Sequence, residues 1–240
     1  MKTLVHKGIA ASVESLVAWH NNISDAQYDV LGIAADIIAN ALKSDGKVLF
    51  TGIGKNVHCC EKLAATCYCL SLNASFFDAV HAMHGDFGMI RNNDVIVAFS
   101  KTGNTSELAT AMTYLREHRE LLAPNCQIIG INFAGGKVTD MNAWADLLVS
   151  LPAIDEDSRN PRIPTNSLLA SQLVGDNIML SVAEQLGTDF DRFYLCHPNG
   201  GLRREYDAEQ QHNKAQPEIT MQTAIHLDSQ GRYIAAVHDN

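Results

Sequence analysis

The chain of 240 residues carries little positive charge: 18 Lys and Arg stand against 27 Asp and Glu, which leaves a formal net charge of −9. Such a surface repels polyanions, so we expect no nucleic acid partner, and a small anion has to be held by local geometry. Long apolar runs are also missing, because no stretch approaches the roughly 20 apolar residues of a membrane span. We therefore expect no membrane partner.

The sequence offers neither a disulfide framework nor an export signal. Its six cysteines contain no C-x-x-C pair, and four of them lie within one apolar helical stretch, which predicts reduced, buried thiols. Glu14 and His20 interrupt the apolar start of the chain, and no A-x-A-like cleavage site follows. We expect a cytoplasmic protein.

Short apolar runs alternate with helical patterns through the middle of the chain. The runs cover residues 47–51, 74–77, 94–99, 127–132 and 145–151, and helical spacing covers 56–72, 105–122 and 165–186, with a weaker helix near Val138. Continuous apolar runs are typical of strands covered on both faces. The pattern predicts an α/β fold with a three-layer, doubly wound sheet of five parallel strands.

The two ends of the chain differ from this middle part. Residues 2–22 and 25–44 show helical spacing separated by turn residues, which predicts an N-terminal helical hairpin over residues 1–44, packed on the core. Residues 45–204 then form the main domain. Residues 205–240 are polar and predict a mobile or exposed tail, in which 224–227 and 233–237 could pair as a hairpin.

The loop after the third predicted strand is rich in hydroxyls and small residues. It reads Ser100-Lys101-Thr102-Gly103-Asn104-Thr105-Ser106-Glu107 and leads into a helix, so backbone N–H groups, hydroxyls and the helix dipole can face one anion. This predicts a phosphate cradle with a carboxylate at its end. Residues 104–107 also fit a structural helix cap, with Glu at the third helical position.

The loop after the first predicted strand is the second candidate for binding an anion. Gly52 and Gly54 allow close backbone approach, and Lys55 adds a cation. A Walker A loop is excluded because Leu49 stands where it requires glycine. Val57 stands where a dinucleotide fingerprint requires a small residue, so an NAD-binding module, with Asp78 facing a ribose, remains only a weaker alternative.

Three further polar segments could carry chemistry. His81 and His84 are three residues apart, a spacing that fits a metal but indicates a structural role more strongly. An acidic run at 155–157 follows the fifth predicted strand, at the edge of the sheet where ligands bind; it fits a solvated turn, or Glu156 or Asp157 is a candidate for proton transfer. His197 precedes Pro and Gly residues that shape an exposed turn, so acid or base work is as plausible as packing. Thr165 fits a helix cap.

Five ordered segments together resemble the sugar isomerase (SIS) domain family, and within it the D-arabinose-5-phosphate isomerase branch. They read Gly-Ile-Gly-Lys at 52–55, His-Gly-Asp-Phe-Gly-Met at 84–89, Ser-Lys-Thr-Gly at 100–103, Pro-Thr-Asn-Ser at 164–167 and His-Pro-Asn-Gly at 197–200. The resemblance covers residues 30–204 approximately. It implies the flavodoxin-like order of the family's sheet and a homotetramer.

The resemblance implies an aldose–ketose isomerase that acts on a sugar phosphate through an enediol, without metal or organic cofactor. It implies catalytic roles for Lys55, Glu107, Glu156 and His197, with Glu156 as the first choice of base and Glu107 as the second. It implies substrate contacts from a larger set, which comprises Gly52, Gly54, His84, Ser100, Thr102, Gly103, Asn104, Thr105 and Thr165.

The sequence departs from the family pattern in three motifs that bear on which sugar is bound: at Asn56 and Val57, at Thr102 and Asn104, and at Asn199. Asn104 replaces an acidic residue of the phosphate loop, and the CBS domain pair usual in the family is missing after residue 204, so we expect no regulation through such domains. A second hypothesis is a sensor that binds phosphosugars without turnover. A sensor needs the hydroxyl loop but neither two carboxylates nor an imidazole, so the enzyme is the favoured interpretation.

Overall fold

The computed structural model describes residues 3–188, 190–199, 201–215, 225–227 and 233–235. The chain divides into two compact units, residues 1–193 and 194–240. The first unit contains the sheet and the helices around it. The predicted borders after residues 44 and 204 stay predictions.

A five-stranded parallel sheet forms the centre of the first unit. Its strands are β1 (Val48–Gly52), β2 (Ala74–Phe76), β3 (Val95–Ser100), β4 (Gln127–Asn132) and β5 (Leu147–Ser150). Their order is β2-β1-β3-β4-β5, and every neighbouring pair is parallel. The predicted doubly wound sheet is confirmed, and its order is the flavodoxin-like one.

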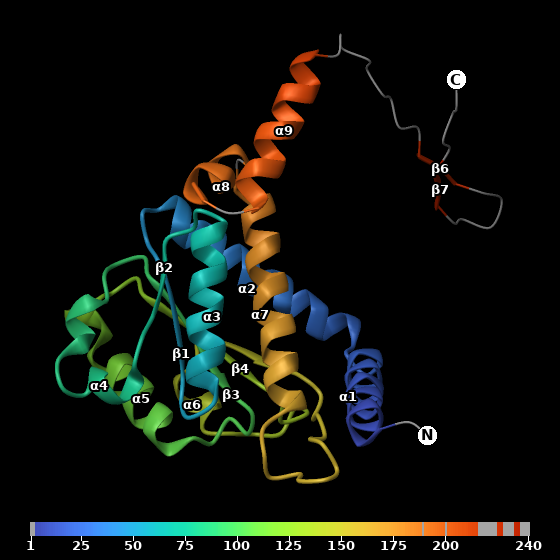
Figure 1. Ribbon diagram of the computed structural model, residues 1–240. Coiled ribbons are helices and arrows are strands. Elements are labelled where there is room, and N and C mark those ends of the chain that lie inside the picture. The colour runs from blue at the N-terminus through green and yellow to red at the C-terminus, as the bar shows by residue number, and fades with distance from the viewer. Residues whose placement is uncertain (1–2, 189, 200, 216–224, 228–232, 236–240) are drawn as a thin grey trace. The chain divides into compact units, whose positions relative to one another are not determined.

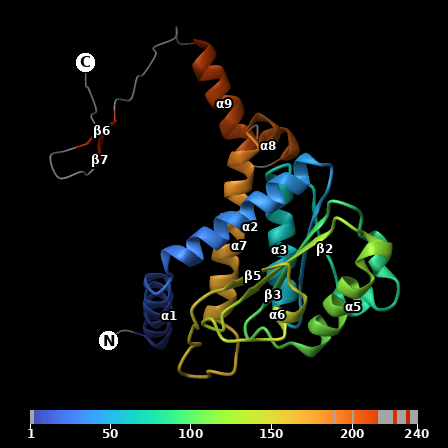
Figure 2. The same cartoon turned by 180° about the vertical axis from the view of Figure 1, so that it is seen from behind.

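Helices cover both faces of this sheet, as Figures 1 and 2 show from opposite sides. One face packs against α2 (Asp25–Lys43), α3 (Asn56–Cys69) and α7 (Asn166–Gln185), and the other against α4 (Ala79–Ala82), α5 (Ser106–Leu122) and α6 (Met141–Trp144). Alternate residues of β3 therefore point into two separate apolar cores: Val97 belongs to the first and Ile96 to the second. The continuous apolar run of β3 follows from this double burial.

The amino-terminal edge of the sheet carries a buried ion pair. Lys47 directly precedes β1 and Asp94 directly precedes β3, and their charged atoms lie 2.8 Å apart. Asp94, whose side chain is 2% exposed, also accepts hydrogen bonds from the backbone N–H groups of Lys47 and Arg91. These contacts fasten two neighbouring strands at the edge opposite to their carboxyl ends.

Two helices precede the sheet, as predicted, although α1 (Leu4–Asn21) is directed away from α2 (Figures 1 and 2). Ser24 begins α2 through a capping box with Gln27, whose side chain also donates to the carbonyl of Ser150 at the end of β5. Trp19 Nε1 donates to the carbonyl of Pro152 at 3.0 Å. The N-terminal helices therefore hold the segment that follows β5.

The second unit contains helical structure that the sequence did not predict. Residues 201–215 form helix α9 (Gly201–Ala215), so the first part of the predicted polar tail is helical. α8 (Phe190–Cys196) precedes it. The predicted hairpin is confirmed in its described part, because β6 (Ile225–Leu227) and β7 (Tyr233–Ala235) pair antiparallel. The rest of the predicted tail lies outside the described residues.

Local differences between prediction and structure are small within the sheet. The predicted strands agree with the observed ones to within two residues at each end. The weak helix expected near Val138 is instead the single turn of α6, where Asn142 Oδ1 accepts hydrogen bonds from the backbone N–H and the hydroxyl of Thr139. Two short turns, α4 and the 3-10 helix Asp86–Met89, were not predicted.

Candidate functional site

The site lies where the strand order reverses, at the carboxyl ends of β1 and β3. These central strands pair with Gly52 opposite Phe99, so the loops that follow them leave the sheet side by side. Connections from β1 and β3 run to opposite faces of the sheet, to α3 and α5 respectively. In open α/β sheets, the crevice left by such a reversal is where ligands bind.

The hydroxyl loop after β3 is closed by its own side chains. Ser100 Oγ lies 2.9 Å from Thr105 Oγ1 and accepts a hydrogen bond from the backbone N–H of Gly103 at 3.1 Å. Thr105 is the N-cap of α5, yet its side chain caps none of the helix N–H groups. The structural cap that the sequence also allowed does not form, because Glu107 is the second helical residue and its carboxylate bonds Ser106. The first turn of α5 thus keeps N–H groups for an anion.

Gly103 and Asn104 give this loop its shape. Gly103 has a φ of +73°, and a Cβ atom there would lie 2.6 Å from Thr139 Oγ1. Asn104 Oδ1 accepts a hydrogen bond from the backbone N–H of Asp140 at 2.8 Å, and Thr102 Oγ1 accepts one from the N–H of Asn104 at 3.2 Å. Asn104, which departs from the family pattern, therefore connects the loop after β3 with the segment before α6.

The glycine loop after β1 presents Lys55 next to the hydroxyl loop. Gly52 is buried beside Phe99 O, whereas Gly54, with a φ of +63°, and Lys55 are exposed. Lys55 is the N-cap of α3, and the next residue, Asn56, donates from its side chain to Phe99 O at 3.4 Å. The backbone of the two neighbouring loops is thus connected through Asn56.

Glu156, in the segment after β5, is buried at the start of α7. Its carboxylate accepts the backbone N–H of Thr165 at 2.8 Å and of Ser167 at 3.2 Å, and both hydroxyls of these residues. It also pairs with Lys101 Nζ at 2.7 Å. Thr165 is the N-cap of α7 but caps nothing with its own side chain. Glu156 therefore caps α7 from outside the helix, where its negative charge complements the helix dipole.

Burial and hydrogen bonding oppose each other at Glu156. Burial raises the pKa of Glu156, but the hydrogen bonds from Lys101, Ser167 and Thr165 outweigh it and lower the pKa to about 2. A carboxylate whose side chain is 1% exposed and which accepts five hydrogen bonds is a poor proton acceptor. In this arrangement Glu156 acts as a positioning residue.

Glu107 has the opposite surroundings. It is exposed on the first turn of α5, one residue after Ser106, whose hydroxyl donates to it at 2.9 Å. Hydrogen bonds from its own backbone N–H and from Ser106 lower the pKa of Glu107. Of the two carboxylates predicted from the sequence, Glu107 is the one open to a ligand in the hydroxyl loop.

The two predicted histidines belong to other segments of the chain, His84 after α4 and His197 after α8. His84 is exposed and follows the turn of α4, where its backbone N–H donates to the carbonyl of His81. No hydrogen bond of the described residues joins it to the hydroxyl loop. His197 belongs to the second unit, where its N–H donates to the carbonyl of Tyr194 at 3.2 Å. The roles of both histidines stay predictions.

Two residues of the cluster had no role assigned from the sequence. Lys101 stands within the hydroxyl loop and Ser167 at the start of α7, and both bond Glu156. The available signal was that Lys101 is the one cation among residues 100–107. Its direction toward a carboxylate 55 residues further along the chain could not be read from local sequence.

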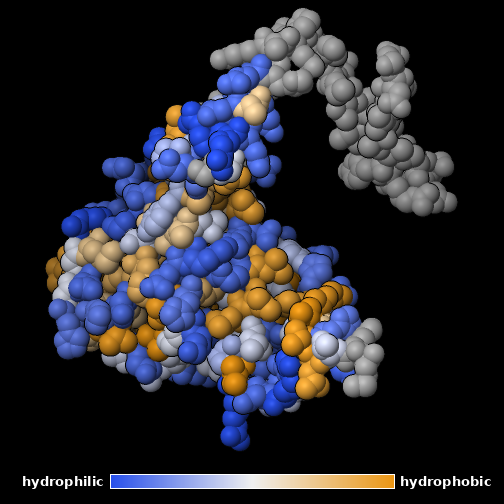
Figure 3. Space-filling view, viewed as in Figure 1, coloured by the Kyte–Doolittle hydropathy of each residue, from blue (hydrophilic) through white to orange (hydrophobic). Residues whose placement is uncertain are grey.

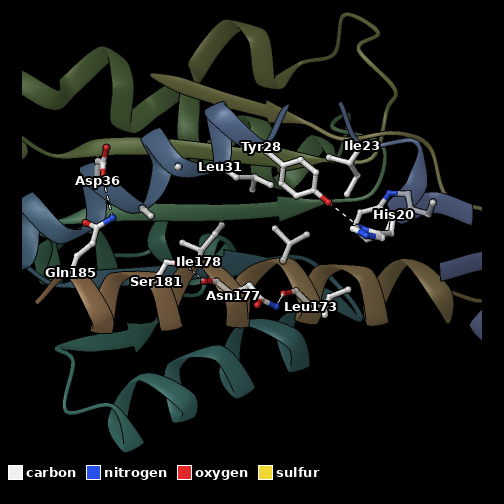
Figure 4. A pocket seen from close by; sticks show the side chains of 14 residues that line it. His20, Ile23, Tyr28, Leu31, Asp36, Leu173, Asn177, Ile178, Ser181 and Gln185 are labelled. Carbon is white, nitrogen blue, oxygen red and sulfur yellow. Dashed lines mark hydrogen bonds between the residues drawn. The ribbon is translucent and has the colours of Figure 1, made fainter. Parts of the chain in front are cut away.

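The described part of the first unit also contains a cavity away from these loops. It has a volume of about 610 Å³ and lies between α2 and α7, bordered by the last turn of α1 (Figure 4). Apolar side chains such as Leu31, Leu173 and Ile178 line it, and Tyr28 contacts His20 at 2.9 Å. This cavity has no cluster of converging charged side chains, and it lies between helices rather than at the carboxyl ends of the strands. We therefore place the candidate chemistry at the strand ends.

The residues that the structure describes form neither a metal-binding cluster nor a membrane-spanning helix. These residues contain no group of three or more His, Cys, Asp or Glu side chains that could hold a metal ion. His81 instead lies 3.6 Å from Asp78, which caps α4. Among the described helices, none combines the length and the apolar character needed to span a membrane.

Comparison with known proteins identifies the domain. Residues 41–124, which include β1 to β3 and the hydroxyl loop, match the model of the SIS domain, so the chain carries a SIS domain. The curated relatives include the arabinose 5-phosphate isomerase KdsD of Francisella tularensis, 30% identical over 172 residues, which are 72% of this chain and 50% of that protein. The KdsD of Yersinia pestis is 31% identical over 160 residues, 67% of this chain and 46% of that protein. The chain spans about half the length of these relatives.

Solved structures show the same fold. The protein c3406 of E. coli CFT073, in complex with arabinose 5-phosphate, has a TM-score of 0.67 at 25% identity, and the match covers 81% of this chain and 96% of that one. The NanR protein of Vibrio vulnificus, complexed with ManNAc-6P, has a TM-score of 0.60 at 13% identity, with 82% and 66% covered. The second likeness shows the fold alone.

Proposed function

We propose that this SIS-domain chain is an aldose–ketose isomerase of sugar phosphates, of the D-arabinose 5-phosphate and D-ribulose 5-phosphate type. One observation carries the proposal. The hydroxyl loop between Ser100 and Thr105 leaves the first turn of α5 uncapped, directly beside an exposed carboxylate, Glu107. An anion site and a candidate base are thus two residues apart, at the edge of the sheet where ligands bind.

The substrate's phosphate group is proposed to bind the hydroxyl loop. Ser100, Thr102 and Thr105 offer hydroxyls there, and the backbone N–H groups of the first turn of α5 offer the positive end of the helix dipole. Phosphate binding is a fixed anchor, because it does not change during the reaction. It holds the carbonyl end of the sugar at a constant distance from the loop.

The reaction transfers one proton between neighbouring carbons. The base removes the proton from C2 of the open-chain aldose while O1 gains a proton, which yields the enediol. O2 then loses its proton and C1 gains one, which yields the ketose. We propose Glu107 as the base, because Glu156 is buried and saturated with hydrogen bonds.

Lys55, as a cation, and His197, as an acid, complete the proposed set of catalytic residues. Lys55, exposed at the start of α3, would stabilise the negative oxygen that develops beside the enediol. His197 would open the sugar ring by acid catalysis, as the family resemblance implies. No step of this scheme uses a metal or an organic cofactor.

The resemblance also implies a homotetramer, and α1 offers a surface for it. Five of its apolar residues, Leu4, Val5, Ile9, Val13 and Val17, are between 52% and 78% exposed. Figure 3 shows apolar side chains gathered along this helix. Exposed apolar patches of this kind mark association surfaces, so we propose that α1 contributes to subunit contacts.

Conversion of sugar phosphates tests the enzyme. We expect the protein to convert D-arabinose 5-phosphate into its ketose, and a panel of pentose and hexose phosphates tests the substrate class. Binding without conversion of any of them would contradict the enzyme and leave the sensor.

The two carboxylates are separated by matched amide variants. Glu107→Gln should lower kcat roughly 100- to 10,000-fold, abolish exchange of the C2 proton with solvent and leave phosphate affinity unchanged. Glu156→Gln should retain exchange. If Glu156→Gln loses exchange and Glu107→Gln keeps it, Glu156 is the base.

A further inference from the structure

Lys101 is placed to bind a ligand as well as to neutralise Glu156. It stands between two hydroxyl residues, Ser100 and Thr102, in the loop proposed to bind phosphate. Its carbonyl accepts a hydrogen bond from the N–H of Phe133 at 3.0 Å, so the loop backbone at this position is fastened to the end of β4. The backbone is thus held, while the long side chain reaches across the edge of the sheet toward α7.

Glu156 is satisfied without Lys101. Its two oxygens accept four hydrogen bonds from Thr165 and Ser167, which suffice for the roughly four lone-pair sites of a carboxylate. The fifth donor, Lys101, is therefore not required to satisfy the buried oxygens. The Lys101 ammonium can therefore bind a ligand while Glu156 continues to cap α7.

The ammonium of Lys101 has donors left over. It carries three N–H groups, and among the described residues its hydrogen-bond partner is Glu156 Oε1 at 2.7 Å. The Lys101 side chain is 38% exposed, whereas that of Glu156 is 1% exposed. The remaining N–H groups are thus open to solvent and available to a ligand.

The negative charge of the chain favours a local cation at an anion site. With a formal net charge of −9, the protein repels an approaching dianion, and a local cation has to offset this field. Lys101 is the cation within residues 100–107. An ammonium fixed by a buried carboxylate is also more ordered than a free surface lysine, so less side-chain entropy is lost when it binds an anion.

We propose that Lys101 binds the phosphate group of the substrate and that Glu156 positions its ammonium over the hydroxyl loop. This deepens the proposed function and rests on it for the identity of the ligand. Lys101 is then a binding residue, whereas Glu156 acts through Lys101 and through the start of α7. The ligand class is a phosphate monoester, recognised by one ammonium, several hydroxyls and a helix N-terminus.

Calorimetric titration with inorganic phosphate and with D-arabinose 5-phosphate tests the first part. Lys101→Met should weaken both by about 10- to 100-fold, since a hydrogen bond to a charged group is lost. Lys101→Arg keeps the charge and should restore most of the affinity. Unchanged phosphate affinity in Lys101→Met, or no phosphate binding by the natural protein, would overturn the proposal.

A second lysine that pairs with a buried carboxylate provides the matched control. Lys47 pairs with Asp94 at 2.8 Å, at the opposite edge of the sheet, so Lys47→Met removes the same charge and breaks a similar pair. It should leave phosphate affinity unchanged. Equal weakening by the two methionine variants would mean that net charge or folding, rather than a contact with Lys101, causes the effect.

The positioning role of Glu156 is tested by a double-mutant cycle. Glu156→Gln should weaken phosphate binding in the natural background, and it should have no further effect when Lys101 is already methionine. A purely structural role would weaken binding equally in both backgrounds and would overturn this part. The double variant also removes the unpaired buried charge, so it guards against failure of Lys101→Met to fold.

The outcomes separate this proposal from the isomerase. Binding of inorganic phosphate requires no turnover, so a loss of affinity in Lys101→Met stands even if no sugar phosphate is converted. Conversely, turnover with unchanged phosphate affinity in Lys101→Met would support the enzyme and refute the role of Lys101.

Discussion

Asn104 Oδ1 accepts a hydrogen bond from the backbone N–H of Asp140 at 2.8 Å, and so joins the loop after β3 to the segment before α6. This hydrogen bond needs a side-chain oxygen at residue 104, either neutral or anionic, because the donor is the backbone N–H of Asp140. The amide of Asn104 therefore helps to fix the shape of the hydroxyl loop.

Replacement of Asn104 tests this connection. Asn104→Ala should lower the free energy of unfolding by about 0.5–1.5 kcal/mol, because one hydrogen bond is lost. Asn104→Asp keeps an acceptor of the same length and should retain most of the stability. Urea unfolding of both variants checks this, and equal destabilisation by alanine and aspartate would contradict the assigned contact.

Gly103 should be intolerant of any side chain. Its φ of +73° disfavours other residues, and a Cβ atom would lie 2.6 Å from Thr139 Oγ1. Gly54, with a φ of +63° and no neighbouring atom within 4 Å of the place a Cβ would take, isolates the conformational cost. We expect Gly54→Ala to destabilise by about 1–2 kcal/mol and Gly103→Ala by clearly more, measured by urea unfolding. Similar values would show that Thr139 moves aside freely.

Acid should weaken the contribution of Glu156 to stability. Although burial raises its pKa, hydrogen bonds lower the pKa to about 2, below that of an unfolded glutamate. A lowered folded pKa gives stability that is complete above about pH 5 and is lost as the pH falls toward 2. Glu156→Gln should therefore be less stable than the natural protein at neutral pH, by about 1–3 kcal/mol.

The difference in free energy of unfolding between the natural protein and Glu156→Gln should become smaller as the pH falls. The comparison is needed because Arg159 also lowers the pKa of Asp157 to about 2, so acid weakens both proteins through that group. Urea unfolding at several pH values from 6 to 3 measures the difference. A difference that stays constant over this range would show that Glu156 does not titrate as assigned.

Thiol reactivity should separate the cysteines by burial. Cys59, Cys60, Cys67 and Cys126 are buried, whereas Cys196 is exposed. Burial raises the pKa of Cys67 and Cys126 to about 12, which leaves little reactive thiolate at neutral pH. A chromogenic disulfide reagent should label Cys196 rapidly in the folded protein, and all six thiols only after unfolding. Cys196→Ser removes the fast phase, and a persistent fast phase would contradict the assignment.

Local sequence predicted the strands of the sheet and the hydroxyl loop of the candidate site. The apolar run at residues 95–99 predicts a strand buried on both faces, and β3 (Val95–Ser100) is that strand, with Val97 and Ile96 in separate cores. The hydroxyl-rich loop follows directly, so its position at a strand end needed only the pattern. Periodicity and composition suffice here because neighbouring residues in the chain make these features.

The sequence did not reveal which helix the polar C-terminal residues form or how the carboxylates divide their work. Residues 201–215 are helical although their composition reads as an exposed tail, because a polar surface helix carries little apolar pattern. The similar spacing of Glu107 and Glu156 from their strands made both of them candidates for the base, since spacing does not reveal hydrogen-bond partners.

The sequence by itself determined the five apolar runs that form the strands, the hydroxyl loop and the resemblance to the family. Only the tertiary structure decided that Glu156 caps α7 and pairs with Lys101, 55 residues away in the chain, while Glu107 stays exposed. The physical reason is that burial and hydrogen bonding at a strand edge depend on which loops the sheet brings together. Two glutamates of the same chemistry therefore differ in burial and in hydrogen-bond partners, although the pKa of both is lowered.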